Sequence, residues 1–176
     1  DLTDFSAAAL AEHVSDVLGP VDILLNNAGA LVNKPFADLD SQDWQQMLAT
    51  NLLGPVKLIQ ALLPLMGRQG ISHIVNIGSM GGFQGSSKFP GLSAYSASKA
   101  ALANLTESLA EELKHQNIRV NCLCPGAVDT AMLRAAFPDY KAPVSSVEMG
   151  EFIGDFALKA YHFLNGKIIP VSLSTP

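Results

Sequence analysis

A phenol and an ammonium group stand four residues apart in Tyr95-Ser96-Ala97-Ser98-Lys99. Residues i and i+4 share one face of a helix, so the Lys99 charge can lie beside the Tyr95 hydroxyl. A tyrosine ordinarily titrates near ~10, and a neighbouring cation favours the phenolate and lowers its pKa. The pair is therefore a candidate general acid/base near neutral pH. Taken alone, Y-x-x-x-K also fits a solvated helix face, so its context decides the interpretation.

Short apolar runs alternate with longer helical patterns along the chain, and this alternation predicts a parallel sheet covered by helices on both faces. The predicted strands are Val21–Leu25, His73–Ile77, Ile118–Leu123 and Lys167–Val171. The predicted helices are Ser6–Leu18, a long segment capped by Asp40 or Ser41 and kinked at Gly54-Pro55, Ser93–His115 and Val147–Phe163. Residues 129–146, with breakers at Pro138 and Pro143, are predicted to be irregular.

Small and polar residues follow three of these strands, at the end of a parallel sheet where ligands bind. They are Asn26-Asn27-Ala28-Gly29, Gly78-Ser79 and Pro125-Gly126-Ala127-Val128-Asp129-Thr130. A plain turn is the alternative for the first motif. Asn51 falls inside the long helix, where an amide has no intrinsic advantage, so a water-binding site competes there with a solvent-facing side chain.

The composition describes one well-buried globular domain over residues 1–176, since 48% of residues are hydrophobic and 15% charged. A net charge of -5 argues against a nucleic-acid partner. No apolar run approaches the roughly 20 residues that span a bilayer, which argues against a membrane. Cys122 and Cys124 share one face of a predicted strand and are expected to be buried free thiols, as in a reducing cytoplasm, with no metal bound.

Asn-Asn-Ala-Gly, Ser79, Tyr95-x-x-x-Lys99 and Pro125-Gly126, in this order, resemble the short-chain dehydrogenases/reductases. The resemblance covers nearly the whole chain and implies a Rossmann-like doubly wound α/β fold. It implies a hydride transfer between NAD or NADP and a small carbonyl or alcohol substrate. Tyr95 would exchange the substrate proton, Lys99 would lower the Tyr95 pKa and hold the nicotinamide ribose, and Ser79 would orient the carbonyl. Asn51 matches the family asparagine that anchors a proton-relay water.

The same resemblance implies further cofactor contacts. Residues expected near the adenine and its ribose are Asp1, Leu2, Asn27, Ala28 and Gly29. Val128 and Thr130 are expected near the carboxamide and phosphates, and Pro125 and Gly126 are expected to contact the cofactor as well. The physics agrees with the catalytic assignment, because two hydroxyls and a cation around a carbonyl oxygen stabilise its developing negative charge.

Two departures from the family pattern affect the interpretation. Ser79 and Tyr95 are a few residues farther apart than usual, so the Gln84–Phe89 region is expected to reshape the substrate mouth. The Gly-rich phosphate turn is missing, and roughly two units of ~30 residues would supply it. We therefore expect an enzyme fragment, the C-terminal portion of the domain, that is inactive alone. A non-catalytic oligomerising or structural module and an isomerase or lyase on the same fold are the alternatives.

The Ser93–His115 helix is expected to form a subunit interface in a homodimer or homotetramer. Its leucines 102, 105, 109 and 113 have the spacing of a core-facing stripe, and Ala100, Ala103 and Ala110 would form a second, small-residue surface. In the resembled family the equivalent helix commonly pairs with its own copy across a two-fold axis.

Overall fold

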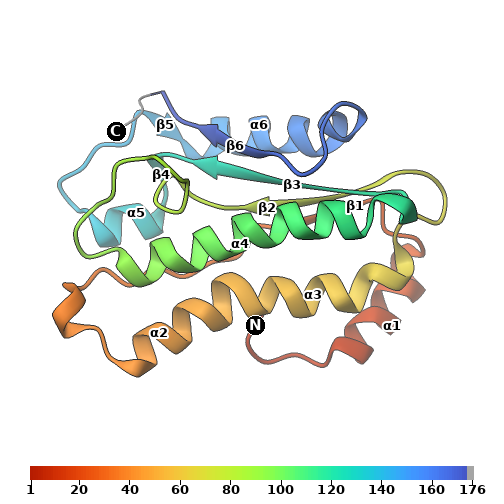
Figure 1. Ribbon diagram of the computed structural model, residues 1–176, viewed down its shortest axis with the longest axis horizontal. Helices are drawn as coiled ribbons and strands as arrows, with labels where there is room; N and C mark the ends of the chain where they lie inside the picture. Colours follow the sequence, from red (N-terminus) through yellow and green to blue (C-terminus); the bar gives the residue numbers. More distant parts are fainter. Residues whose placement is uncertain (174–176) are drawn as a thin grey trace.

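The structure, a computed structural model, describes residues 1–173 and places helices and strands in alternation (Figure 1). The first half contains α1 (Ala7–Leu18), β1 (Ile23–Asn26), η1 (Phe36–Asp38), α2 (Ser41–Leu48), η2 (Ala49–Leu53), α3 (Gly54–Leu62), η3 (Leu63–Leu65) and β2 (Ser72–Ile77). The second half contains α4 (Ser93–Glu112), η4 (Lys114–Gln116), β3 (Ile118–Pro125), β4 (Val128–Asp129), α5 (Ala131–Ala136), β5 (Val144–Ser145), α6 (Ser146–Lys159), η5 (Ala160–His162) and β6 (Ile168–Val171).

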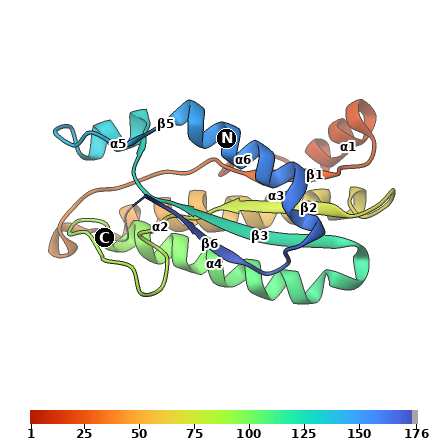
Figure 2. The same cartoon turned by 90° about the horizontal axis from the view of Figure 1, so that it is seen from above.

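Four strands form a parallel sheet in the order β1-β2-β3-β6, with β1 and β6 at its edges. Helix α6 lies on one face, and α4 with the α2–α3 segment lies on the other (Figures 1 and 2). Helix α1 packs against α3 through Val14. The predicted α/β fold with a parallel sheet flanked by helices is confirmed.

The alternation of side chains along the strands divides the core into two layers. On the α4 face, Leu24, Ile74 and Val120 join one apolar cluster. On the α6 face, Val75 and Leu123 join another, which includes residues of α6. All six residues of β2 are buried, as expected for a central strand covered on both sides.

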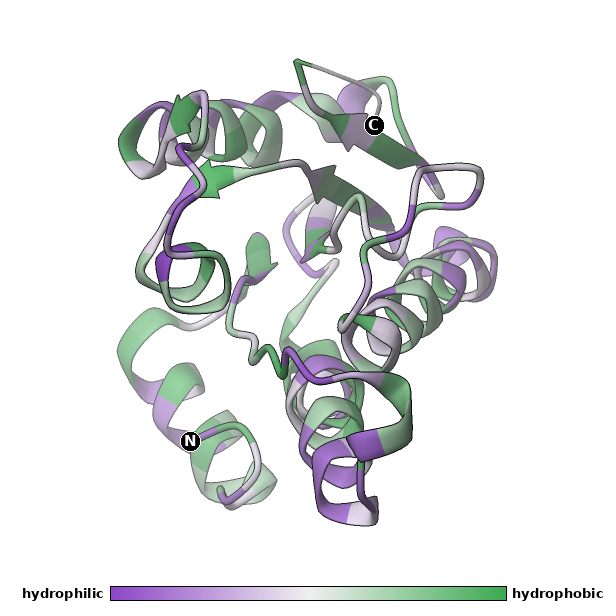
Figure 3. Ribbon diagram, turned by 90° about the vertical axis from the view of Figure 1, so that its left-hand side faces the viewer, coloured by the Kyte–Doolittle hydropathy of each residue, from purple (hydrophilic) through white to green (hydrophobic). Residues whose placement is uncertain are grey.

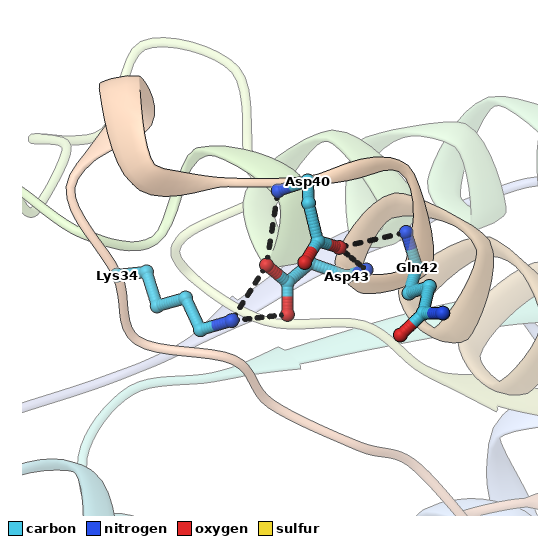
Figure 4. A network of polar contacts seen from close by, with 4 residues as sticks. All are labelled: Lys34, Asp40, Gln42 and Asp43. Carbon is cyan, nitrogen blue, oxygen red and sulfur yellow. Dashed lines mark hydrogen bonds and ion pairs between the residues drawn. The ribbon is translucent and has the colours of Figure 1, made fainter.

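The long helix begins at Ser41 and is capped by Asp40, one of the two caps that the sequence predicts. The Asp40 carboxylate accepts hydrogen bonds from the backbone N–H groups of Gln42 and Asp43, at 2.8 and 2.9 Å, and the Asp43 carboxylate accepts from the Asp40 N–H at 3.1 Å (Figure 4). This reciprocal capping box satisfies N–H groups that have no partner within the helix. Asp43 also receives two 2.8 Å bonds from Lys34, which together with the Asp40 N–H hold its pKa below the usual value.

The irregularity expected at Gly54-Pro55 is a π-helical turn, η2, directly before it. Proline has no N–H to donate, and its ring clashes with the carbonyl four residues earlier, which is that of Asn51. A widened turn at this point accommodates the ring. Asn51 therefore lies in a distorted turn of an otherwise continuous helix.

The whole segment from Ser41 to Leu65 is long and apolar enough to cross a membrane by length and composition. Core helices pass the same test, and this one packs against α1 and α4. Its buried residues, including Met47, Ile59 and Leu62, are part of the protein core.

Two expectations about local structure are wrong. Ala103 and Ala110 do not form a second surface of α4, because both are buried within the chain, at 8% and 3% exposure. Leu105 and Leu109 lie half-buried at the flank of the core instead. Residues 129–146 are also more ordered than predicted, since β4 pairs in parallel with β5 and α5 lies between them.

A buried histidine joins the sheet to α6. His73 is fully buried, its Nδ1 lies 2.9 Å from the Ala157 carbonyl oxygen, and its Nε2 lies 3.0 Å from Nδ2 of Asn121. A carbonyl only accepts, so Nδ1 carries the proton and Nε2 accepts from Asn121. Burial lowers the pKa of His73, and the Ala157 carbonyl opposes that shift.

We expect this histidine to make stability depend on pH. The folded chain keeps His73 neutral while the unfolded chain takes up a proton below pH 6.5, so the free energy of unfolding falls as pH drops through that value. Urea denaturation at about pH 7.5 and about pH 5.5 should show a larger loss for the wild type than for His73→Gln. Equal losses would contradict the assignment.

Candidate active site

The polar residues singled out by the sequence lie around the carboxyl ends of the strands, the side of the molecule that faces the viewer in Figure 3. The mostly apolar strands end there, and the loops after β1, β2 and β3 surround them. In a parallel sheet the carboxyl ends of the strands are where the chain leaves the core and where ligands have access.

Tyr95 and Ser79 come together at the end of β2. Ser79 follows the last residue of the strand by two positions, and its Oγ accepts a hydrogen bond from the Gly81 N–H at 3.1 Å. Tyr95 lies in the first turn of α4, half-buried. Burial raises the pKa of the Tyr95 phenol above its usual value, while a hydrogen bond with the Ser79 hydroxyl opposes the shift.

Lys99 occupies the same side of α4, one turn further on, and is 5% exposed. Its Nζ donates to the Ile77 carbonyl oxygen at 2.7 Å, at the end of β2. Burial lowers the pKa of Lys99 to about 8, although the Cys122 and Cys124 thiols raise it. The sequence predicted a lowered pKa for Tyr95; in the structure burial raises it, and the Lys99 ammonium is directed to the Ile77 carbonyl.

Asn51 is fully buried, and its side chain fastens the loop after β1. Its Oδ1 accepts from the Ala30 N–H at 2.8 Å, and its Nδ2 donates to the Ala30 carbonyl at 2.9 Å. The alternative of a solvent-facing side chain is wrong. A Cβ on Gly29 would lie 3.2 Å from Oδ1 of Asn51 and 3.4 Å from Nζ of Lys99, so the absence of a side chain there keeps the three residues close.

The other residues expected to hold a cofactor lie at or after the carboxyl ends of β1 and β3, except Asp1 and Leu2, which precede α1. Asn27 and Ala28 are exposed after β1, and Gly126 follows β3, where its N–H donates to the Val171 carbonyl at 2.9 Å. Pro125 ends β3, Val128 lies in β4, and Thr130 caps α5 by accepting from the Leu133 N–H at 3.2 Å. Asp1 accepts from Thr3 within its own turn, and Leu2 lies against Gly54 of α3.

Among these residues, Gly29 together with Lys99 fits the ribose of a dinucleotide cofactor. Gly29 leaves room beside Lys99, a cation that could hold ribose hydroxyls, and exposed backbone lies beside it after β1. Within residues 1–173, no group of three or more histidine, cysteine or acidic side chains could hold a metal ion.

Two features of the site were not predicted. Cys122 and Cys124 form its floor: their sulfur atoms are 3.9 Å apart, and a Cβ on Gly78 would lie 2.8 and 2.9 Å from them. A hydrogen bond between the two free thiols raises the pKa of Cys122 and lowers the pKa of Cys124. Ser98 contacts Asn51 from inside α4. The two-residue spacing predicted that the cysteines share one face of β3, but not that this face lies beside the site.

The longer loop after β2 lines a cavity of about 910 Å³ on the outer side of α4. Its walls are Gln84, Gly85, Lys88 and Phe89 from the loop, Pro35 and Phe36 from the loop after β1, and small residues of α4 such as Ala97 and Ala100. Tyr95, Ser79 and Lys99 are not among the lining residues that the structure describes. The expected effect of this loop on the substrate mouth stays a prediction.

Comparisons with known proteins agree with this fold. The family profile "short chain dehydrogenase" matches residues 1–141. Nodulation protein G of Azospirillum brasilense is 37% identical over 146 residues, which are 82% of this chain and 58% of that protein. Ketoacyl reductase HetN of Nostoc sp. is 39% identical over 121 residues, 69% of this chain and 41% of that protein. This chain thus spans about half the length of these relatives.

Solved structures show the same fold. A gluconate 5-dehydrogenase from Burkholderia cenocepacia J2315, in complex with NADP and tartrate, superposes with a TM-score of 0.87 at 25% identity, covering 98% of this chain and 71% of that one. A short chain dehydrogenase from Escherichia coli CFT073, in complex with NADPH, superposes with a TM-score of 0.86 at 29% identity, covering 97% and 72%. The parallel sheet flanked by helices is the Rossmann-like fold of these dehydrogenase structures. The chain belongs to the short-chain dehydrogenase family.

Proposed function

We propose that this protein is an NAD(P)-dependent oxidoreductase that interconverts a small carbonyl compound and its alcohol. The observation that carries the proposal is the convergence of the Tyr95 phenol, the Ser79 hydroxyl and the buried Lys99 ammonium at the carboxyl end of β2. Hydroxyl donors and a cation at one point suit a substrate oxygen that gains negative charge.

In this proposal Tyr95 moves the proton. It gives its phenolic proton to the carbonyl oxygen in reduction and recovers one in oxidation, while Ser79 donates a hydrogen bond to the same oxygen. Asn51 keeps the Ala30 loop in place through its two bonds and would anchor a relay water. When bound, the nicotinamide cofactor supplies or accepts the hydride.

The residues proposed to hold NAD or NADP are Lys99, with Asp1, Leu2, Asn27, Ala28, Gly29, Tyr95, Pro125, Gly126, Val128 and Thr130. The position of Gly29 beside Lys99 supports this assignment most directly. Two of the superposed structures were solved with NADP or NADPH, which supports a nicotinamide cofactor for this chain as well.

The proposal is tested with a panel of aldehydes, ketones and alcohols, using NADH, NADPH and their oxidised forms and following nicotinamide absorbance. The protein assayed is this chain and any longer polypeptide that contains it. Turnover of at least one carbonyl/alcohol pair is expected. Failure of every pair, in a protein that binds the cofactor, would contradict the proposed reaction.

We also propose a cytoplasmic homo-oligomer. The unbridged thiols of Cys122 and Cys124 suit a reducing compartment. The outer side of α4 presents Ala97 and Ala100, small exposed residues that let a second copy approach, next to exposed Phe36 and Phe89. Light scattering at micromolar concentration should give at least twice the monomer mass, and a monomer would refute this interface.

A further inference from the structure

Ser98 lies between Tyr95 and Lys99 in sequence, and its side chain contacts Asn51 and the backbone of Tyr95. It is fully buried. Its hydroxyl donates to the Tyr95 carbonyl oxygen at 2.7 Å and accepts from Nδ2 of Asn51 at 3.0 Å. Both the hydrogen and a lone pair of the hydroxyl are thus engaged, which fixes its direction.

These bonds complete a chain of contacts between three elements. Ala30, in the loop after β1, is held by Asn51 in the π-helical turn η2, and Asn51 is held by Ser98 in α4. The last bond of the chain reaches the backbone of Tyr95 itself. A fully satisfied buried network of this kind restricts its members more than separate bonds would.

The first turn of α4 has particular need of such a tether. Tyr95 is the third residue of the helix, and among the residues that the structure describes no side chain caps the preceding Leu92. The ends of helices fray when their groups lack partners. In place of a capping side chain, Ser98 links this turn to Asn51 through its hydrogen bonds to both.

We propose that Ser98 is a positioning residue for Tyr95, which it holds in register with Asn51 and the Ala30 loop by hydrogen-bonding the Tyr95 backbone. This inference rests on the proposed function, in which the Tyr95 hydroxyl must meet the substrate oxygen at a fixed place. A displacement of about 1 Å in such a group can cost up to ~10²-fold in rate.

The test compares Ser98→Ala with Thr106→Val, because α4 contains a second hydroxyl of the same kind. Thr106 is also fully buried, accepts from the Asn76 amide at 2.9 Å and donates to the Leu102 carbonyl at 2.9 Å. It lies about three helical turns beyond Tyr95. Both variants lose one hydroxyl from a buried amide network, so a merely structural role predicts equal effects on activity.

We expect Ser98→Ala to lower kcat about tenfold with little change in KM, and Thr106→Val to change kcat less than about twofold. Tyrosine labelled with ¹³C at the ring carbon bearing the hydroxyl provides a readout without turnover. The Tyr95 signal should shift or broaden and titrate at a different pH in Ser98→Ala, and remain as in the wild type in Thr106→Val.

An unchanged kcat and an unchanged Tyr95 signal in a folded Ser98→Ala protein would overturn the proposal, and so would equal changes in both variants. The proposed function fails separately. If the wild type turns over no carbonyl/alcohol pair while the Tyr95 signal responds to Ser98→Ala alone, the positioning role stands and the oxidoreductase assignment falls.

Discussion

Replacing Tyr95 with phenylalanine is expected to lower kcat by about 10²–10⁴-fold, the usual contribution of a general acid/base. The variant removes the phenolic proton at the end of β2 and leaves the ring, so the half-buried side chain keeps its packing. Cofactor affinity and the unfolding transition should change little. Steady-state kinetics in both directions, with cofactor titration by fluorescence, check both parts of the expectation.

Tyr161→Phe is the matched control. Tyr161 lies in η5, where its ring centroid is 5.8 Å from that of His73, at the far end of the sheet from the site. It loses the same hydroxyl without contact to Ser79 or Lys99, and should keep wild-type kcat. Activity of Tyr95→Phe within a few-fold of the wild type would remove the acid/base role from Tyr95.

The pH dependence offers a further check on the same residue. Because burial raises the Tyr95 pKa, the phenol of the free protein stays protonated at neutral pH and can donate. Reduction should therefore fall only as pH rises into the range where the phenol ionises. The sequence alone predicted the opposite direction of the shift.

That reversal shows what the spacing of residues can and cannot predict. The i, i+4 relation of Tyr95 and Lys99 correctly placed both on one side of α4. Spacing does not reveal how deeply a side chain is buried, nor that the Ile77 carbonyl lies within 2.7 Å of the ammonium group. Both depend on how α4 packs on β2, which local sequence does not encode.

The central strands and the long helix were predictable because their signals are local. The apolar runs of β2 and β3 reflect burial on both faces, and Asp40 with Asp43 forms a reciprocal cap within four residues. The short pair β4 and β5 was not predictable. Each strand has two residues, and their pairing joins Val128 to Val144 across an intervening helix.

Helix α4 shows the limit of a hydrophobic pattern. Its leucines predicted a core stripe, but the deeply buried side combines apolar Leu102 and Ala110 with the polar residues Ser98, Lys99 and Thr106. A pattern based on apolar residues alone places the expected core-facing stripe of the helix away from the buried polar residues. The polar residues are buried because each has a partner, and those partners come from β2 and η2.

Replacing Lys99 with methionine is expected to abolish most activity without lowering stability. The ammonium is 5% exposed, and its pKa of about 8 compares with an ordinary value of 10.5. At 1.36 kcal/mol for each pKa unit, keeping the charge in the fold costs about 3 kcal/mol. Methionine has nearly the same length and no charge, so it removes this cost. It also loses the hydrogen bond to the Ile77 carbonyl, which costs about 1–3 kcal/mol.

The sign of the pH effect distinguishes this explanation from simple repacking. Between about pH 8 and pH 10.5 the unfolded chain binds a proton at Lys99 that the folded chain has released. The stability contributed by this residue therefore rises with pH over that range. We expect the advantage of Lys99→Met over the wild type to be largest below pH 8 and to shrink as pH approaches 10.5.

Denaturant unfolding at several pH values, with cofactor titrations, measures these effects together. The cofactor should bind more weakly to Lys99→Met, because the proposed ribose contact is gone, and kcat should fall by about 10²-fold or more. A variant that is less stable than the wild type at every pH would mean that the Lys99 ammonium stabilises the fold. A less stable but fully active variant would show that Lys99 supports the structure rather than the proposed reaction.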